Sequence, residues 1–103
     1  MPRHEVFMPT YVSLCRWTNL GAQKVKESPT RLEAAKKGFE AEGVKILSFF
    51  MTTGKYDMII LSEAPDDAAI AKAILTQISN GGITTETSRA FTEDEYKAIL
   101  GSI

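Results

Sequence analysis

The chain has 103 residues, of which 44% are hydrophobic and 24% charged, and these proportions are typical of one globular domain. Twelve basic and thirteen acidic residues give a net charge of −1, which argues against a nucleic-acid partner because such a partner usually requires a basic surface. The single cysteine excludes an intrachain disulfide and a cysteine-only metal site.

No stretch of the sequence has the length and apolar character of a membrane span. The densest apolar run covers only residues 46–51, whereas a span needs about 20 residues. Residues 1–7 lack the apolar core of a signal peptide. We therefore expect a cytoplasmic protein that does not bind membranes and keeps its thiol reduced.

The N-terminal part of the chain predicts a strand followed by a short helical turn. Residues 10–17 are rich in β-forming side chains and predict the strand, and residues 20–27 predict the turn. Thr18 or Asn19 can cap this turn, because either side chain can accept a hydrogen bond from a free backbone N–H.

A longer helix is predicted to follow. Ser28 is expected as its N-cap and Pro29 lies in its first turn, and the helix runs to about residue 42, where Gly43 ends it. At helical spacing, its apolar face carries Leu32, Ala35 and Phe39.

A hairpin is predicted after this helix. Its strands cover residues 44–52 and 56–62, and Thr53, Gly54 and Lys55 form the connection. We expect Gly54 to supply a turn position with positive φ, because glycine adopts that conformation without steric cost.

The last third of the chain predicts a helix, a strand and a short terminal helix. Pro65-Asp66-Asp67 opens the first helix and Asn80-Gly81-Gly82 ends it. A polar strand follows over residues 83–90. Thr92 and Glu95 have the spacing of a capping box that opens the terminal helix. The apolar stripe of the longer helix carries Ile70, Ile74 and Ile78.

The order of elements is βαββαβ with a C-terminal helix. Right-handed crossovers place both main helices on the same face of one antiparallel sheet. The predicted fold class is therefore α+β with a ferredoxin-like arrangement.

The strands carry apolar residues on both faces, although helices are expected on only one. In the second strand, strict alternation places Leu47, Phe49 and Met51 on one face and Ile46 and Phe50 on the other. A bare apolar sheet face would exceed what monomers usually expose. We expect a second copy to cover it, sheet on sheet, in a homodimer. The alternative is that the terminal helix folds back over the same face.

Two sequence segments offer candidate catalytic residues. In the segment from Gly54 to Asp57, Tyr56 could donate a proton and Asp57 could act as a base. The structural alternative has Asp57 accepting backbone N–H bonds and Tyr56 packing at the dimer seam. Glu86 lies in a polar stripe of the fourth strand, which is either a solvated or dimer contact or the wall of a pocket.

The candidate ligand-binding residues come from the ends of the strands. Arg89 can bind a carboxylate in bidentate fashion, and Arg16 can bind an anion. Trp17 is either a packing residue or a pocket wall. Cys15 is expected to be a buried strand residue, because no histidine has the spacing of a partner. One histidine and one cysteine give no metal-ligand pattern, so we expect no metal and no cofactor.

Several motifs in one order resemble the GYD domain family. They are Met8 to Val12, Arg16 to Thr18, Ser28 to Leu32, Gly54-Lys55-Tyr56-Asp57, Glu63 to Asp67, Thr85 to Thr87 and Arg89 to Thr92. The resemblance implies a GYD-type domain over residues 8–103, preceded by an extension over 1–7, and assembly as a dimeric α/β barrel. The effector-binding domain of leucine- and asparagine-responsive regulators has a similar hairpin and last strand, and binds small effectors between subunits.

We therefore expect a homodimer or higher homo-oligomer that binds or senses a small molecule. The pocket is expected between the helices and the sheet or at the subunit seam, lined by Tyr11, Trp17, Tyr56 and Arg89. One alternative is a cofactor-free enzyme of the monooxygenase or isomerase type, in which Tyr56, Asp57 or Glu86 transfers a proton. A second alternative is a purely structural oligomer.

Overall fold

The computed structural model describes residues 7–103 and contains one four-stranded antiparallel sheet. The strands are β1 (Thr10–Trp17), β2 (Lys45–Met51), β3 (Met58–Glu63) and β4 (Ile83–Ala90), in the spatial order β2-β3-β1-β4. β1 therefore lies between β3 and β4 and pairs with both in antiparallel register. The α+β, ferredoxin-like prediction is confirmed. The predicted extension over 1–7 lies, apart from Phe7, outside the described residues.

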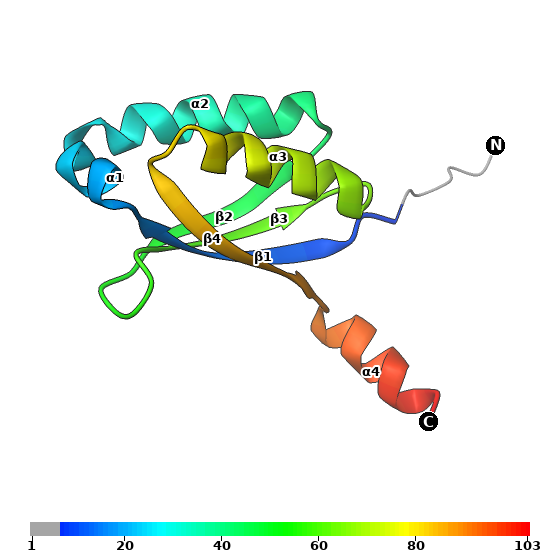
Figure 1. Ribbon diagram of the computed structural model, residues 1–103. Helices are drawn as coiled ribbons and strands as arrows, with labels where there is room; N and C mark the ends of the chain where they lie inside the picture. Colours follow the sequence, from blue (N-terminus) through cyan, green and yellow to red (C-terminus); the bar gives the residue numbers. More distant parts are fainter. Residues whose placement is uncertain (1–6) are drawn as a thin grey trace.

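Helices cover one face of the sheet (Figure 1). The long helices are α2 (Ser28–Ala41) and α3 (Asp67–Ser79), and both lie over that face. The short helix α1 (Asn19–Gln23) and the 3-10 turn η1 (Val25–Glu27) connect β1 to α2. The last helix, α4 (Glu93–Gly101), extends from the end of β4 away from the sheet. None of the helices in residues 7–103 is long and apolar enough to cross a membrane.

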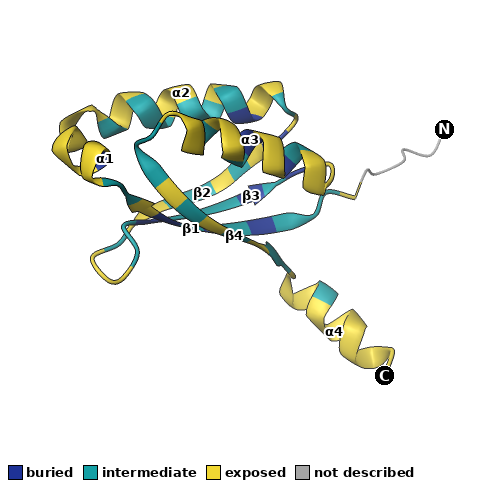
Figure 2. Ribbon diagram, viewed as in Figure 1, coloured by how far each residue is buried: buried dark blue, intermediate teal, exposed yellow. Residues whose placement is uncertain are grey.

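The core lies between the sheet and the two long helices, and Figure 2 shows its buried residues there. Its buried members are Tyr11, Phe39, Val44, Ala64, Ile70 and Ala73. Phe39 and Ile70 are buried as predicted. Ile78 is 36% exposed, and Ala73 takes the inward position instead. The inward stripe of α3 therefore runs through Ile70, Ala73 and Ile74, which fits the helical period better than a strict spacing of four.

Three helices have side-chain N-caps, and those at Thr18 and Thr92 are the predicted ones. The Thr18 side chain accepts a bond from the Gly21 N–H at 3.1 Å, and Asp66 accepts one from the Ala69 N–H at 2.8 Å. Thr92 and Glu95 form the complete capping box of α4. The prediction for α2 was wrong, because Ser28 is already its first residue. The preceding turn η1 runs directly into α2, so its right-handed backbone takes the place of a side-chain cap.

The hairpin differs from the prediction at its turn. β3 begins at Met58, so Tyr56 and Asp57 lie in the connecting loop and not in the strand. The Asp57 carbonyl accepts from the Thr52 N–H at 2.9 Å, and the Asp57 N–H donates to the Cys15 carbonyl at 2.8 Å. Gly54 does not have a positive φ; within residues 7–103 only Gly43 and Gly81 do. A loop of this length closes without a left-handed residue.

A β-bulge in β2 overturns the predicted faces of that strand. The register of β2 on β3 shifts between Ile46 and Ser48. After the shift, Phe49 pairs with Ile60 and faces the helices, as Ile46 does. The strict alternation used for the prediction placed these two residues on opposite faces. A bulge adds one residue to the strand and reverses the side-chain alternation beyond it.

The sheet face opposite the helices carries an apolar patch. Its members are Val12, Leu14, Phe50, Ile59 and Leu61. Leu14 pairs with Ile59 and Val12 with Leu61, so the four side chains are neighbours on two adjacent strands. Because α4 extends away from the sheet, the predicted alternative that it covers this face is wrong (Figure 1).

Candidate functional site

A cavity of ≈ 660 Å³ lies between the sheet and the helices α1, α2 and α3. This volume is within the range of sites for small organic molecules, about 300–1,000 Å³. Its apolar walls are formed mainly by Trp17, Leu32, Phe39, Phe49, Ile60 and Ile83. The cavity is therefore a candidate site for a small ligand.

The cavity exists because α2 presents small residues toward it. Ala34, Ala35 and Gly38 all line the space. The position of a Cβ on Gly38 would be 3.6 Å from the Gln77 side-chain nitrogen of α3, so the two helices approach each other closely there. Small side chains on the inner face of a helix leave volume that the opposite layer cannot fill.

The sheet supplies a polar floor below the helices. Cys15 and Thr85 line the cavity. Beside them, the Ser13 and Thr87 hydroxyls form a hydrogen bond of 2.9 Å, and Thr85 and Thr87 form one of 3.2 Å. Burial raises the pKa of the Cys15 thiol, so this group stays protonated at neutral pH and is a poor nucleophile.

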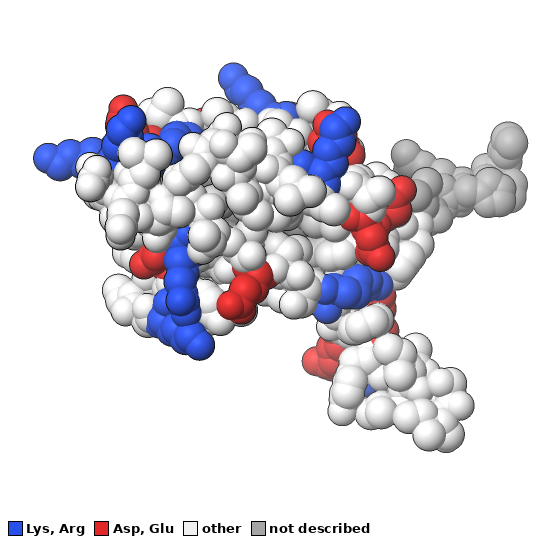
Figure 3. Space-filling view, in the orientation of Figure 1, with Lys and Arg blue, Asp and Glu red and all other residues white. Residues whose placement is uncertain are grey.

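All charged residues that line the cavity lie at one end of it. They are Lys24 and Glu27, from the connection between α1 and α2, and Arg31, from the first turn of α2. In Figure 3, basic side chains lie at this end of the molecule, at the left of the view, and the upper centre of the visible face is uncharged. The cavity thus has a charged rim and a mainly apolar interior.

A second group of candidate residues lies on the sheet face opposite the helices. The Tyr56 hydroxyl donates to Glu86 Oε2 at 2.9 Å, and the Arg16 guanidinium lies 4.9 Å from the centre of the Tyr56 ring. The hydrogen bond to Glu86 is the main cause that raises the pKa of Tyr56. This cluster is exposed and faces away from the cavity.

Asp57 has a structural contact. Its carboxylate accepts a hydrogen bond from the Trp17 N–H at 2.9 Å. Together with its own N–H bond to the Cys15 carbonyl, this fixes the hairpin loop to the end of β1. The contact agrees with the predicted structural alternative, in which Asp57 accepts backbone N–H bonds.

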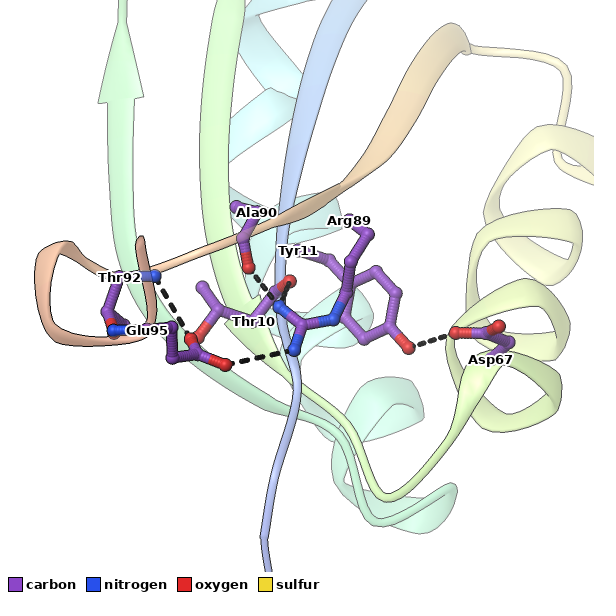
Figure 4. A network of polar contacts seen from close by, with 7 residues as sticks. All are labelled: Thr10, Tyr11, Asp67, Arg89, Ala90, Thr92 and Glu95. Carbon is purple, nitrogen blue, oxygen red and sulfur yellow. Dashed lines mark hydrogen bonds and ion pairs between the residues drawn. The ribbon is translucent and has the colours of Figure 1, made fainter. Parts of the chain in front are cut away.

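Tyr11 and Arg89 lie at the opposite end of β1, where Figure 4 shows their polar contacts. The buried Tyr11 hydroxyl donates to Asp67. Burial, followed by this hydrogen bond, raises the pKa of Tyr11 to about 12. Tyr11 is therefore a neutral anchor between the sheet and α3 at every physiological pH.

Arg89 is fully engaged within the chain. It forms an ion pair of 3.1 Å with Glu95, donates to the carbonyls of Thr10 and Ala90, and lies 4.4 Å from the centre of the Phe91 ring. The Thr92 N–H, followed by Arg89, lowers the pKa of the Glu95 carboxyl. These contacts fix the start of α4 to the end of the sheet (Figure 4).

The structure separates the predicted site residues into three places. Of the predicted ligand-binding residues, only Trp17 lines the cavity. Arg16 and Tyr56 belong to the exposed cluster, whereas Tyr11 and Arg89 anchor the other end of the sheet. Sequence reasoning missed the charged rim with Arg31. The signal that could have found the cavity is the series of small residues on α2.

Comparisons with known proteins give two findings. The family model described as "GYD domain" matches residues 11–100. A protein of Thermus thermophilus named "Glutamine synthetase and cystathionine beta-lyase binding protein" is 32% identical to this chain over 84 residues, which cover 81% of this chain and 88% of the relative. The family match spans the cavity, the apolar patch and all but the last residue of α4.

Proposed function

The chain belongs to the GYD domain family, and we propose that it is a binding protein that holds a small, largely apolar molecule in the cavity between helices and sheet. The observation that carries this proposal is the cavity itself, with a volume of ≈ 660 Å³ and mainly apolar walls. Few, well-placed polar groups in an apolar cavity are typical of ligand sites.

The positions of the titratable residues favour binding over proton-transfer catalysis. Tyr56 forms a hydrogen bond with Glu86 on the opposite sheet face. The Asp57 carboxylate accepts a hydrogen bond from the Trp17 backbone N–H. Away from the charged rim, the titratable group that lines the cavity is the Cys15 thiol, whose pKa is raised. A general acid or base must be within hydrogen-bond reach of the reacting atoms, and Tyr56, Asp57 and Glu86 do not line the cavity.

We further propose that the protein is a homodimer formed through the apolar patch. The patch carries five apolar side chains on a sheet face that no element in residues 7–103 covers. Monomers rarely leave such a contiguous surface in water. A second copy would bury it sheet against sheet, with the two cavities on the outer sides of the dimer.

Binding of an enzyme is a second candidate function. The name of the Thermus relative describes it as binding two enzymes. We expect this chain to co-elute with purified glutamine synthetase in gel filtration. Separate elution of both this enzyme and cystathionine beta-lyase from the chain would contradict this second candidate, without bearing on the cavity.

Ala35→Phe tests the proposed ligand site. Ala35 lines the cavity on α2, so a phenyl ring there occupies ligand space, and filling an empty apolar volume leaves stability unchanged or raises it by about 1 kcal/mol. Trp17 is the sole tryptophan of the sequence and lines the same cavity, so its fluorescence reports occupancy. With decanol as the probe, we expect saturable binding to the unmodified chain and affinity at least about tenfold weaker for Ala35→Phe.

The matched control is Ala41→Phe, which makes the same change at the exposed end of α2, outside the cavity. It should bind decanol as the unmodified chain does. If decanol leaves the Trp17 signal of the unmodified chain unchanged, or if both variants bind equally well, the cavity is not the ligand site.

A further inference from the structure

The charges at the rim of the cavity are unequal in sign. Lys24 and Arg31 are basic and Glu27 is acidic, and no other charged residue lines the cavity within residues 7–103. The rim therefore carries a net positive charge at neutral pH, next to an apolar interior. A cavity with a positive rim and a mainly apolar interior fits a ligand that has one anionic end and an apolar body.

Arg31 is held in place by backbone contacts. Its Nη2 atom donates to the Lys24 carbonyl at 3.1 Å and lies 3.5 Å from the Gly21 carbonyl. Its Nε atom lies 3.9 Å from the position that a Cβ on Gly82 would take. The guanidinium thus spans the gap between α2 and the α1 end of the cavity, so little side-chain freedom is left to lose on binding.

The acidic residue at the rim leaves both cations available. Glu27 reaches Arg31 only at 3.9 Å, and the two side chains are 66% and 39% exposed, so water weakens this pair. For the Lys24 amine, no acidic side chain in residues 7–103 lies within 4.0 Å. A ligand carboxylate can therefore gain contacts with both cations without displacing a strong ion pair.

We propose that the ligand is an amphipathic carboxylic acid, whose carboxylate binds Arg31 and Lys24 and whose apolar body fills the cavity. This inference rests on the proposed function, because it names the chemistry of the molecule that the cavity holds. A carboxylate gains short, charge-assisted hydrogen bonds from a guanidinium, and at the rim it keeps part of its hydration. An amine ligand would meet two like charges at the same place.

The test compares decanoate with decanol, which have the same chain length and differ in charge. At about pH 8 the acid is ionised. Titrations followed by Trp17 fluorescence should show decanoate binding about tenfold more tightly than decanol. Arg31→Met and Lys24→Met, which keep the apolar stems, should each reduce this preference severalfold while the affinity for decanol stays unchanged.

The control variant is Lys36→Met, on the same helix but outside the cavity, where Lys36 pairs with Glu33 at 3.4 Å. It should keep the full preference for decanoate. The inference is overturned if decanol binds as tightly as decanoate, or if the preference survives both rim substitutions. In either case decanol still binds, so the proposed function stands, whereas a failure of decanol to bind overturns the proposed function as well.

Discussion

Gly21→Ala is expected to lower the free energy of unfolding by about 2 kcal/mol, because there is no space for a side chain at this position. A Cβ at Gly21 would lie 2.0 Å from the Gly82 carbonyl oxygen, and the atom in the way belongs to the backbone, so it cannot rotate aside. Relieving the contact requires α1 to move away from the start of β4. Overpacking costs up to about 3 kcal/mol, and the better helix propensity of alanine offsets about 1 kcal/mol of it.

The displacement of α1 would also break two hydrogen bonds at the same contact. The Thr18 N–H donates to the Gly82 carbonyl at 3.0 Å, and the Thr18 hydroxyl donates to the Gly81 carbonyl at 2.6 Å. These bonds close the end of the cavity where Arg31 lies. We therefore expect Gly21→Ala to weaken decanol binding as well as stability.

Gly82→Ala is the matched control, because it adds the same methyl group on the other side of the contact. Its Cβ would meet only the Arg31 side chain, at 3.9 Å, which is an ordinary van der Waals distance. Urea unfolding should show a change within about 1 kcal/mol for this variant. Equal stability of Gly21→Ala and the unmodified chain would show that α1 does not pack on Gly82.

The elements of the fold could be predicted because their signals are local. β1 and β4 have the predicted bounds, and Thr18 and the Thr92 capping box begin their helices as expected. Each of these signals depends on residues within a few positions of each other. The bulge in β2 depends instead on pairing with β3, so alternation within β2 alone could not reveal it.

The candidate site could be predicted only in part, because side-chain partners come from distant segments. Arg89 has the chemistry of a carboxylate ligand, and the structure gives it a carboxylate from its own chain, Glu95. The capping box already identified Glu95 in the sequence. Its ion pair with Arg89 could be recognised only from the structure at the end of β4. The cavity lies between the helix layer and the sheet. The small residues of α2 therefore indicate a cavity only when the position of the sheet below them is known.

The apolar patch leads to the prediction with the largest effect on assembly, the change Leu61→Lys. Leu61 pairs with Val12 of β1 and Ser48 of β2, so it lies within the patch rather than at its edge. In a twofold dimer the substitution buries two like charges in one apolar interface. An unpaired buried charge costs several kcal/mol, which weakens the dimer more than about a hundredfold.

Light scattering coupled to gel filtration at micromolar concentration should therefore give a dimer mass for the unmodified chain and a monomer mass for Leu61→Lys. Leu75→Lys is the matched control, since Leu75 is 64% exposed on α3, on the helix side of the sheet. It should remain a dimer.

Leu61→Lys should also stay folded, because a lysine at a strand position open to water can extend its amine into solvent. A monomeric mass for the unmodified chain would mean that water, and not a second copy, covers the patch.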